Sequence, residues 1–220
     1  MTSRARPAAP ARRKPAPERS AEIVAAASTV AVTEGLDKVT AKRVAEQLGV
    51  FPGLIAHYVR SADELVAIAF ATAATAEREE VYARARAGAS ATEQLRLLLD
   101  NYVDPARDAV ALLWLDAWQA SRRRPALHDE VTRQMNHDLD WLSELIAAGQ
   151  RTGEFRTRDS RAAAMRILAL VDGLSVQAAI RDAFDYADVQ HMLRRTVEHE
   201  LGLGDGAIYG PAPAGSRPVR

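Results

Sequence analysis

Two short helical patterns meet at a tight turn within residues 36–65, which read LDKVTAKRVAEQLGVFPGLIAHYVRSADEL. Thr40 suits the N-cap of the first helix, in which apolar positions recur four residues apart. Gly49 suits the left-handed residue that ends such a helix, and Pro52 suits the first position of the next one. This spacing predicts a helix-turn-helix in which residues 52–58 form the second, recognition helix.

This motif has two interpretations, and its place in the chain helps to choose between them. It could be a DNA-binding helix-turn-helix, or it could be a corner of an all-helical core, where two helices also meet at a turn. Here the motif lies near the N-terminus and follows an amphipathic helix with Ile23, Ala27 and Val30 on one face. It also precedes a capping box at residues 61–64, which opens a longer helix. These neighbours favour DNA binding over a purely structural corner.

The distribution of charge points the same way. Residues 1–60 contain ten Lys or Arg and five Asp or Glu, a net charge of +5. The whole chain has 29 of each, so the remainder carries −5. A positive N-terminal part suits contact with phosphate. A disordered basic tail without a partner would explain five of these bases but not those beside the turn.

Several classes of protein are excluded by what the sequence lacks. With no cysteine, the chain has no disulfide, thiolate metal site or cysteine nucleophile. The five histidines form no metal-binding spacing, and no Gly-rich phosphate loop or serine elbow occurs. We therefore expect no enzyme, metal or cofactor. His137 with Asp140 or Glu144 is more typical of a solvated helix face than of a catalytic site.

Targeting and membrane signals are also absent from the sequence pattern. No apolar run approaches the roughly 18 residues that span a bilayer. Residues 1–17 are basic but hold four prolines and no apolar segment, so they do not resemble a signal peptide. We expect a cytoplasmic protein with no membrane partner.

The remaining pattern predicts an all-α protein with disordered ends. A 48% hydrophobic content allows a sizeable core. Residues 1–17, a basic arm, and 202–220 are too rich in Pro, Ala, Arg or Gly to fold. A helix-turn-helix DNA-binding domain is expected over 18–65, and a ligand-binding and dimerisation domain over 66–201. The expected helices are 20–34, 40–48, 52–58, 61–86, 91–103, 106–122, 126–151, 160–183 and 188–201.

Residues 20–65 resemble the DNA-binding domain of the TetR family of bacterial regulators. The matching residues are Gly35, Thr40, Val44-Ala45, Gly49-Val50, Gly53-Leu54-Ile55, His57-Tyr58 and Asp63-Glu64-Leu65. The run GLIAHY, together with ALLWLDAWQASRRRPALHDEV, LIAAGQRTGEF and ALVDGLSVQAAI, is similar to the BetI-like branch of that family. Three residues depart from the pattern. Phe51 replaces the usual capping Ser, Val59 an aromatic residue, and Ala62 a Lys that touches phosphate, a contact that Arg60 could replace.

The resemblance implies a homodimeric, nine-helix repressor that binds a palindromic operator and is released by a small-molecule effector. A dimer also suits the physics, because two recognition helices reach half-sites about 34–36 Å apart or more. The last two helices would pair with their mates in a four-helix interface. The apolar stripe expected in that interface comprises Ile167, Leu170, Leu174 and Ala178. The alternative is that this stripe packs inside one subunit.

Two groups of residues are candidates for contact with DNA. Donors near helix N-termini suit phosphate contacts, and these are Thr40, Lys42, Arg43, His57, Tyr58 and Arg60. Thr40 could be only a cap, and His57 an exposed residue without a role. The candidates for base edges are Phe51, Pro52 and Leu54, with Gly53 allowing close approach of the backbone. Such contacts are apolar, so specificity should depend largely on the shape of the DNA.

The candidate ligand site consists of aromatic and acidic side chains in the body. Trp114 and Trp118 lie four residues apart on one helix. On another, His137, Trp141 and Glu144 share a face. Such rings and acids could bind a cationic ligand such as a choline-like compound or a polyamine. The tryptophans could instead be core packing.

Asp172 is the last candidate for the ligand site, as a buried acid beside Ser175 and Val176, although it could instead form a helix–helix hydrogen bond. A helical protein-interaction scaffold without sequence-specific DNA binding is the alternative for the whole chain. The sequence pattern does not itself distinguish repression from activation, whereas the resemblance implies a repressor.

Overall fold

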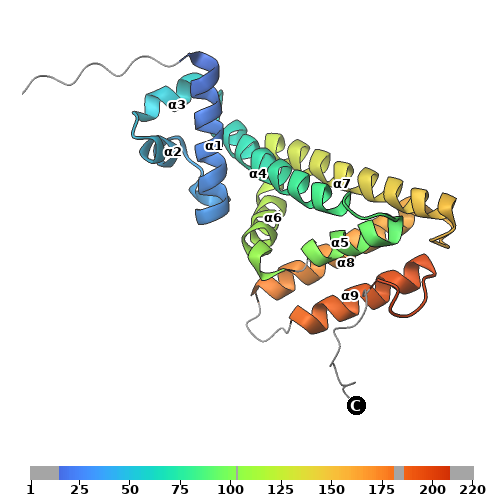
Figure 1. Cartoon of the computed structure of the whole chain (residues 1–220). Helices are drawn as coiled ribbons and strands as arrows, with labels where there is room; N and C mark the ends of the chain where they lie inside the picture. The colour runs from blue at the N-terminus through green and yellow to red at the C-terminus, as the bar shows by residue number, and fades with distance from the viewer. Residues whose placement is uncertain (1–14, 103, 181–185, 209–220) are drawn as a thin grey trace, which may run out of the picture.

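The computed structural model describes residues 15–102, 104–180 and 186–208, and the regular secondary structure in these ranges is all helical. Three helices form a small head, namely α1 (Ala16–Glu34), α2 (Ala41–Leu48) and α3 (Pro52–Tyr58). The long helix α4 (Ala62–Ala85) leaves the head and runs into a larger body (Figure 1). The body adds α5 (Ala91–Tyr102), α6 (Asp108–Ser121), α7 (Pro125–Thr152), α8 (Ser160–Ile180) and α9 (Tyr186–Leu201). The expected all-α fold is confirmed.

The ends of these helices follow from local chemistry. Ser61 accepts a hydrogen bond from the Glu64 backbone N–H at 3.0 Å and so caps α4. The Glu64 carboxylate accepts from the Arg60 N–H, one residue before the cap. Gly153 ends α7 in the left-handed conformation. Short 3-10 helices, Leu36–Lys38 and Pro105–Arg107, precede α2 and α6.

Two hydrophobic clusters form the core, and both include part of α4. The head cluster joins α1, α2 and α3 to residues 65–74 of α4 and also contains Leu113, Ala117, Leu127 and Val131 from α6 and α7. The body cluster joins residues 81–85 of α4 to α5, α7, α8 and α9. The expected domain boundary at residue 65 therefore falls inside the head cluster, and α4 connects the two clusters.

Both expected disordered ends need correction at their inner limits. Helix α1 begins at Ala16, because Pro17 suits its first turn. After α9, the chain turns at Gly202 and returns to the body cluster, where Ile208 is fully buried. The Ile208 N–H donates to the buried Glu198 carboxylate at 2.9 Å. Burial of one isoleucine and this hydrogen bond order a segment whose composition alone suggested a tail. Residues 1–14 and 209–220 lie outside the described residues.

Helix α8 is long and apolar enough, by length and composition, to cross a membrane. The sequence pattern predicts no such segment, because scattered charged residues interrupt the apolar run of this helix. A single helix of this kind is weak evidence for a membrane span, since core helices pass the same test. Only 33% of its most apolar window is buried in this subunit, so much of an apolar helix faces outward.

Candidate DNA-binding surface and ligand cavity

The turn between α2 and α3 has the geometry expected of a helix-turn-helix. The Thr40 hydroxyl accepts the Arg43 backbone N–H at 3.1 Å, so Thr40 does cap α2. Gly49 lies in the left-handed region with φ 65° and reverses the chain. Buried Val44 and Ile55 anchor α2 and α3 in the head cluster, which leaves the opposite side of α3 to solvent.

The N-terminal end of α3 projects an apolar, uncapped surface. Phe51 is 87% exposed and occupies the N-cap position without a side-chain hydrogen bond. Pro52, Gly53 and His57 are also exposed, whereas Leu54 is half-buried. A Cβ added at Gly53 would meet nothing within 4 Å. Nothing inside the subunit therefore requires glycine at this position.

The predicted phosphate contacts differ in how free their side chains are. Lys42 has an 81% exposed side chain, 4.0 Å from Glu46. Arg43 instead binds Glu34 through two hydrogen bonds of 2.9 and 2.6 Å, which ties α2 to α1 and raises the pKa of Arg43. Arg60 is exposed beside α3, and Tyr58 is half-buried against the ring of its neighbour His57. Lys42 and Arg60 are the more available cations.

A cavity of about 100 Å³ lies in the body between α4, α6, α7 and α8. Three of the six predicted ligand residues line it, Trp114, Trp118 and Asp172. His137 and Glu144 are exposed and do not line it. Trp141 lies behind the cavity wall, stacked on Tyr82 with ring centroids 4.0 Å apart.

Several polar lining residues were not predicted from the sequence. They come from α4, α5, the turn before α6, and α7, and comprise Glu77, Arg78, Tyr82, Tyr102, Arg107 and Asp138. Asp138 was missed although it follows His137 directly, because one step along a helix rotates the side chain by about 100°. The presence of two acids on helices that face each other could have suggested a polar cavity, but not which acids would meet.

Most charged groups in the cavity already have a partner. Glu77 forms an ion pair with Arg107. Asp138 accepts the Tyr82 hydroxyl at 2.6 Å. Burial raises the pKa of Asp138, while the Tyr82 hydrogen bond and the charges of Arg78 and His137 oppose that rise.

Asp172 has a different environment. Among the residues that the structure describes, it makes no hydrogen bond or ion pair. Burial raises its pKa to about 7, and the nearby charge of Asp138 contributes to that rise. The cavity thus contains one carboxylate with no partner of its own.

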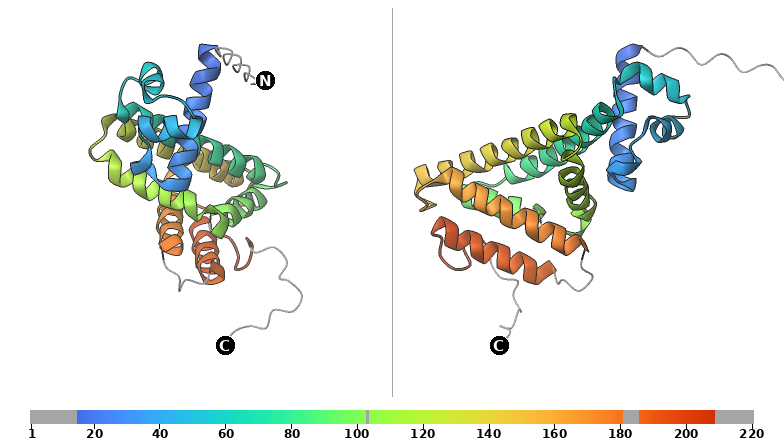
Figure 2. Two further views of the ribbon diagram at one scale, coloured as in Figure 1. Left: turned by 90° about the vertical axis from the view of Figure 1, so that its left-hand side faces the viewer. Right: turned by 180° about the vertical axis from the view of Figure 1, so that it is seen from behind.

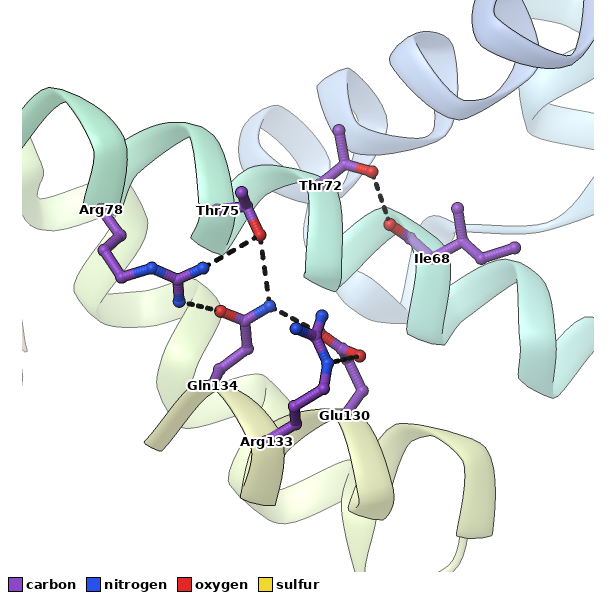
Figure 3. A network of polar contacts seen from close by, with 7 residues as sticks. All are labelled: Ile68, Thr72, Thr75, Arg78, Glu130, Arg133 and Gln134. Atoms are coloured by element: carbon purple, nitrogen blue, oxygen red, sulfur yellow. Dashed lines mark hydrogen bonds and ion pairs between the residues drawn. The ribbon is translucent and has the colours of Figure 1, made fainter. Parts of the chain in front are cut away.

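A polar network at the edge of the cavity joins α4 to α7 (Figure 3). Arg78 donates to the amide oxygen of Gln134, which is fully buried. The Gln134 amide nitrogen contacts Glu130 at 2.6 Å and Thr75 at 3.3 Å. Because Arg78 lines the cavity, the network connects the cavity wall to the packing between these two helices.

Carboxylates also join α6 and α7 to the first turn of α4 and to the head. The Ala126 N–H, in the first turn of α7, donates to Asp63 at 3.0 Å. Asp116 of α6 accepts the Leu36 N–H at 3.4 Å, next to the end of α1. Because Trp114 and Trp118 flank Asp116 on α6, one helix lines the cavity and also contacts the head.

The stripe predicted for a dimer interface is largely internal. Ile167, Leu174 and Ala178 are buried within this subunit, and Leu170 is half-buried against the body cluster. The three buried residues pack inside this subunit, as the alternative interpretation stated. An apolar helical period predicts that a face is buried, but it does not indicate whether the same subunit or a partner subunit covers that face. The exposed face of α8 contains Met165, Ala169, Gly173 and Ile180 instead. Helix α8 lies beside α9 in the body (Figure 2).

Within the described ranges, no group of three or more His, Asp or Glu could hold a metal ion.

Comparison with known proteins identifies the family. The model of the BetI-type transcriptional repressor C-terminal domain matches residues 91–202. The regulator BetI of Cronobacter sakazakii is 29% identical over 168 residues, which cover 74% of this chain and 81% of the relative. BetI of Pseudomonas aeruginosa is 27% identical over 195 residues, with 86% and 96% covered.

Solved structures share the fold. A TetR-family transcriptional regulator from Rhodococcus sp. has a TM-score of 0.72 at 24% identity, with 84% of this chain and 99% of that chain covered. A transcriptional regulator from Saccharomonospora viridis, solved in complex with choline, has a TM-score of 0.73 at 22% identity, with 84% and 98% covered. These relatives are regulators and not enzymes. The chain therefore belongs to the TetR family of transcriptional regulators and has a C-terminal domain of the BetI type.

Proposed function

We propose that this regulator is a cytoplasmic repressor that binds a palindromic operator as a homodimer and releases it when a small cation enters the body cavity. The observation that carries the DNA-binding part is the exposed N-terminal end of α3, where Phe51 projects into solvent. Lys42 stands exposed on the preceding helix, where it can reach phosphate. The apolar surface would contact base edges and the cation would position the head on the duplex.

The first test is fluorescence anisotropy on DNA from upstream of the gene that encodes this protein, at several salt concentrations. Lys42→Ala should weaken binding to every duplex by a similar factor and lower the slope of log affinity against log salt by about 1 per head. Lys38→Ala is the matched control, because Lys38 is a head lysine already paired with Asp37 at 2.8 Å. No binding to any duplex, or association that does not weaken with salt, would favour a helical protein-interaction scaffold. An equal loss of affinity in both variants would show that Lys42 has no special role in the phosphate contact.

The cavity supports a compact cationic effector. Trp114, Trp118, Tyr82 and Tyr102 provide aromatic surface, and such rings attract a cation by about 0.5–2 kcal/mol each. Its acids outnumber its arginines, with Glu77, Asp138 and Asp172 against Arg78 and Arg107. A volume of about 100 Å³ suits a small, compact ligand, since an apolar cavity of about 150 Å³ binds benzene.

Choline is a suitable probe, because the structural relative from Saccharomonospora viridis was solved with it. Its neutral isostere 3,3-dimethylbutan-1-ol has the same shape without the charge. Choline should bind the cavity and lower affinity for the operator, whereas the neutral compound should bind much more weakly. Equal binding of the two compounds would argue against a cationic effector.

The dimer would use the outward faces of α8 and α9. Gly173 is exposed in the middle of the α8 face, and a Cβ added there meets nothing within 4 Å in the subunit. Gly173→Arg should therefore leave the subunit folded but place a charge in the interface. Light scattering should then report the monomer mass of 23.9 kDa rather than twice that value. Asn136→Arg on the exposed side of α7 should remain dimeric, and a dimer in both variants would place the interface elsewhere.

A further inference from the structure

Within the described part of the chain, each charged side chain around the cavity has a hydrogen-bond or ion-pair partner, with the exception of Asp172. Glu77 of α4 forms an ion pair with Arg107, which lies in the turn before α6. Arg78, also on α4, is held by Gln134, and its charge acts on Asp138. The hydroxyl of Tyr82 binds Asp138 of α7, which leaves Asp172 of α8.

The other titratable groups near Asp172 do not neutralise it. Tyr102 of α5 lines the cavity, and burial raises its pKa well above the usual value, so it stays neutral. His137 acts on Asp138 rather than on Asp172. No described residue of α9 lines the cavity. Asp172 therefore faces one acid, Asp138, and no cation in direct contact.

We propose that Asp172 is a proton-for-cation exchange site, which holds a proton while the cavity is empty and loses it when the ammonium group of the effector binds beside it. The inference rests on the proposed cationic effector and adds a coupling to pH. The exchange balances, because one carboxylic proton leaves to solvent, one carboxylate forms, and one monovalent cation takes the place of that proton. The O–H bond of Asp172 is the only bond that breaks.

The physical reason is that two carboxylates in a poorly solvated cavity cannot both be ionised at low cost unless two cations neutralise them. Arg78 supplies one positive charge, and it acts on Asp138. Without an effector, a proton on Asp172 completes the neutralisation. The pKa of Asp172, raised to about 7 by burial and by Asp138, agrees with this account.

The sign of the pH dependence follows from linkage. Below about pH 7 the empty protein holds the Asp172 proton, and binding of a cation must release it. Affinity should then fall by up to about tenfold for each pH unit below that value. Above about pH 8 the carboxylate is already ionised, so the affinity should level off.

The test is isothermal titration of the full-length protein with choline across about pH 5.5 to 8.5, in pairs of buffers with different ionisation enthalpies. The enthalpy difference between buffers counts the protons released. For the wild type we expect close to one proton per site at about pH 6 and almost none at about pH 8.5. Binding with no proton release at any pH would overturn the proposal, and this result needs no variant.

Two isosteric variants locate the proton. Asp172→Asn should bind choline weakly, release no proton and show no change of affinity with pH. Asp138→Asn removes the same charge from the facing helix and should keep the proton release, with its midpoint at lower pH, because the Asp138 charge helps to raise the pKa of Asp172. Proton release that persists in Asp172→Asn, or disappears only in Asp138→Asn, would assign the exchange to another group and overturn the proposal.

The neutral isostere separates this inference from the proposed function. Binding of 3,3-dimethylbutan-1-ol should release no proton, since it carries no charge to replace one. If choline binds tightly at every pH without proton release, the cationic effector stands and the exchange fails. If choline binds no better than the neutral compound, the proposed effector class fails, and the exchange fails with it.

Discussion

Replacing Phe51 with serine is expected to stabilise the head and, in the same protein, to weaken binding to the operator. Phe51 occupies the N-cap of α3 but offers no acceptor to the first backbone N–H groups. Serine would supply one, and a good N-cap is worth about 1 kcal/mol. Because Phe51 is 87% exposed, its removal loses little packing. An apolar contact with a base would be lost once in each head, so operator affinity should fall by about tenfold or more.

Thermal unfolding and fluorescence anisotropy on the same preparations would measure the two effects. Phe51→Leu is the matched control, because it keeps an apolar side chain and adds no cap. It should leave the unfolding temperature unchanged and retain more of the affinity than the serine variant. A serine variant with wild-type affinity for the operator would show that Phe51 does not reach the bases.

Replacing Gly149 with alanine should cause the largest loss of stability. A Cβ at this position in α7 would clash with the ring of Phe155, which is 3% exposed in the body cluster. The ring has little room to move, because the Phe155 backbone is held by a hydrogen bond to the Gly149 carbonyl at 3.1 Å. Overpacking of a core of this kind costs about 1–3 kcal/mol, occasionally more.

Calorimetry should show the unfolding temperature of Gly149→Ala falling by about 2–4 °C for each kcal/mol lost. Gly53→Ala is the matched control, since this glycine also lies inside a helix, α3, but its added Cβ meets nothing within 4 Å in the subunit and it lies outside the proposed dimer interface. It should unfold at the wild-type temperature or slightly higher, because alanine favours the helix by about 1 kcal/mol. The proteins must be compared at equal concentration if they are dimers. Unchanged stability in Gly149→Ala would mean that Phe155 repacks freely.

The helices and the turn were predictable because their signals are local. Thr40, Gly49 and Ser61 act within a few residues of their own positions, and the structure has each in the expected role. The segment 202–208 was not predictable, since its order depends on Ile208 finding a space in a cluster built by residues far along the chain. Composition reports how much apolar surface a segment has, and not whether a site for it exists.

The candidate sites were predictable only in part, for a related reason. Helical periodicity correctly put Trp114 and Trp118 on one face of α6, and both line the cavity. Periodicity does not show how α7 is rotated about its own axis within the body. That rotation directs Asp138 into the cavity and leaves Glu144 in solvent. The ion pair between Arg43 and Glu34 could not be predicted from the sequence either, because it depends on how α2 lies against α1.

The sharing of α4 between both clusters has a consequence for the exchange of operator specificities among related regulators. The head cluster contains Leu113 and Leu127 from the body, so a chimera joined at residue 60 or 65 would cut through one core and expose apolar surface on both halves. Substitutions confined to the exposed end of α3 avoid that cut. New operator preferences should therefore be easier to obtain by grafting a few surface residues than by grafting whole heads.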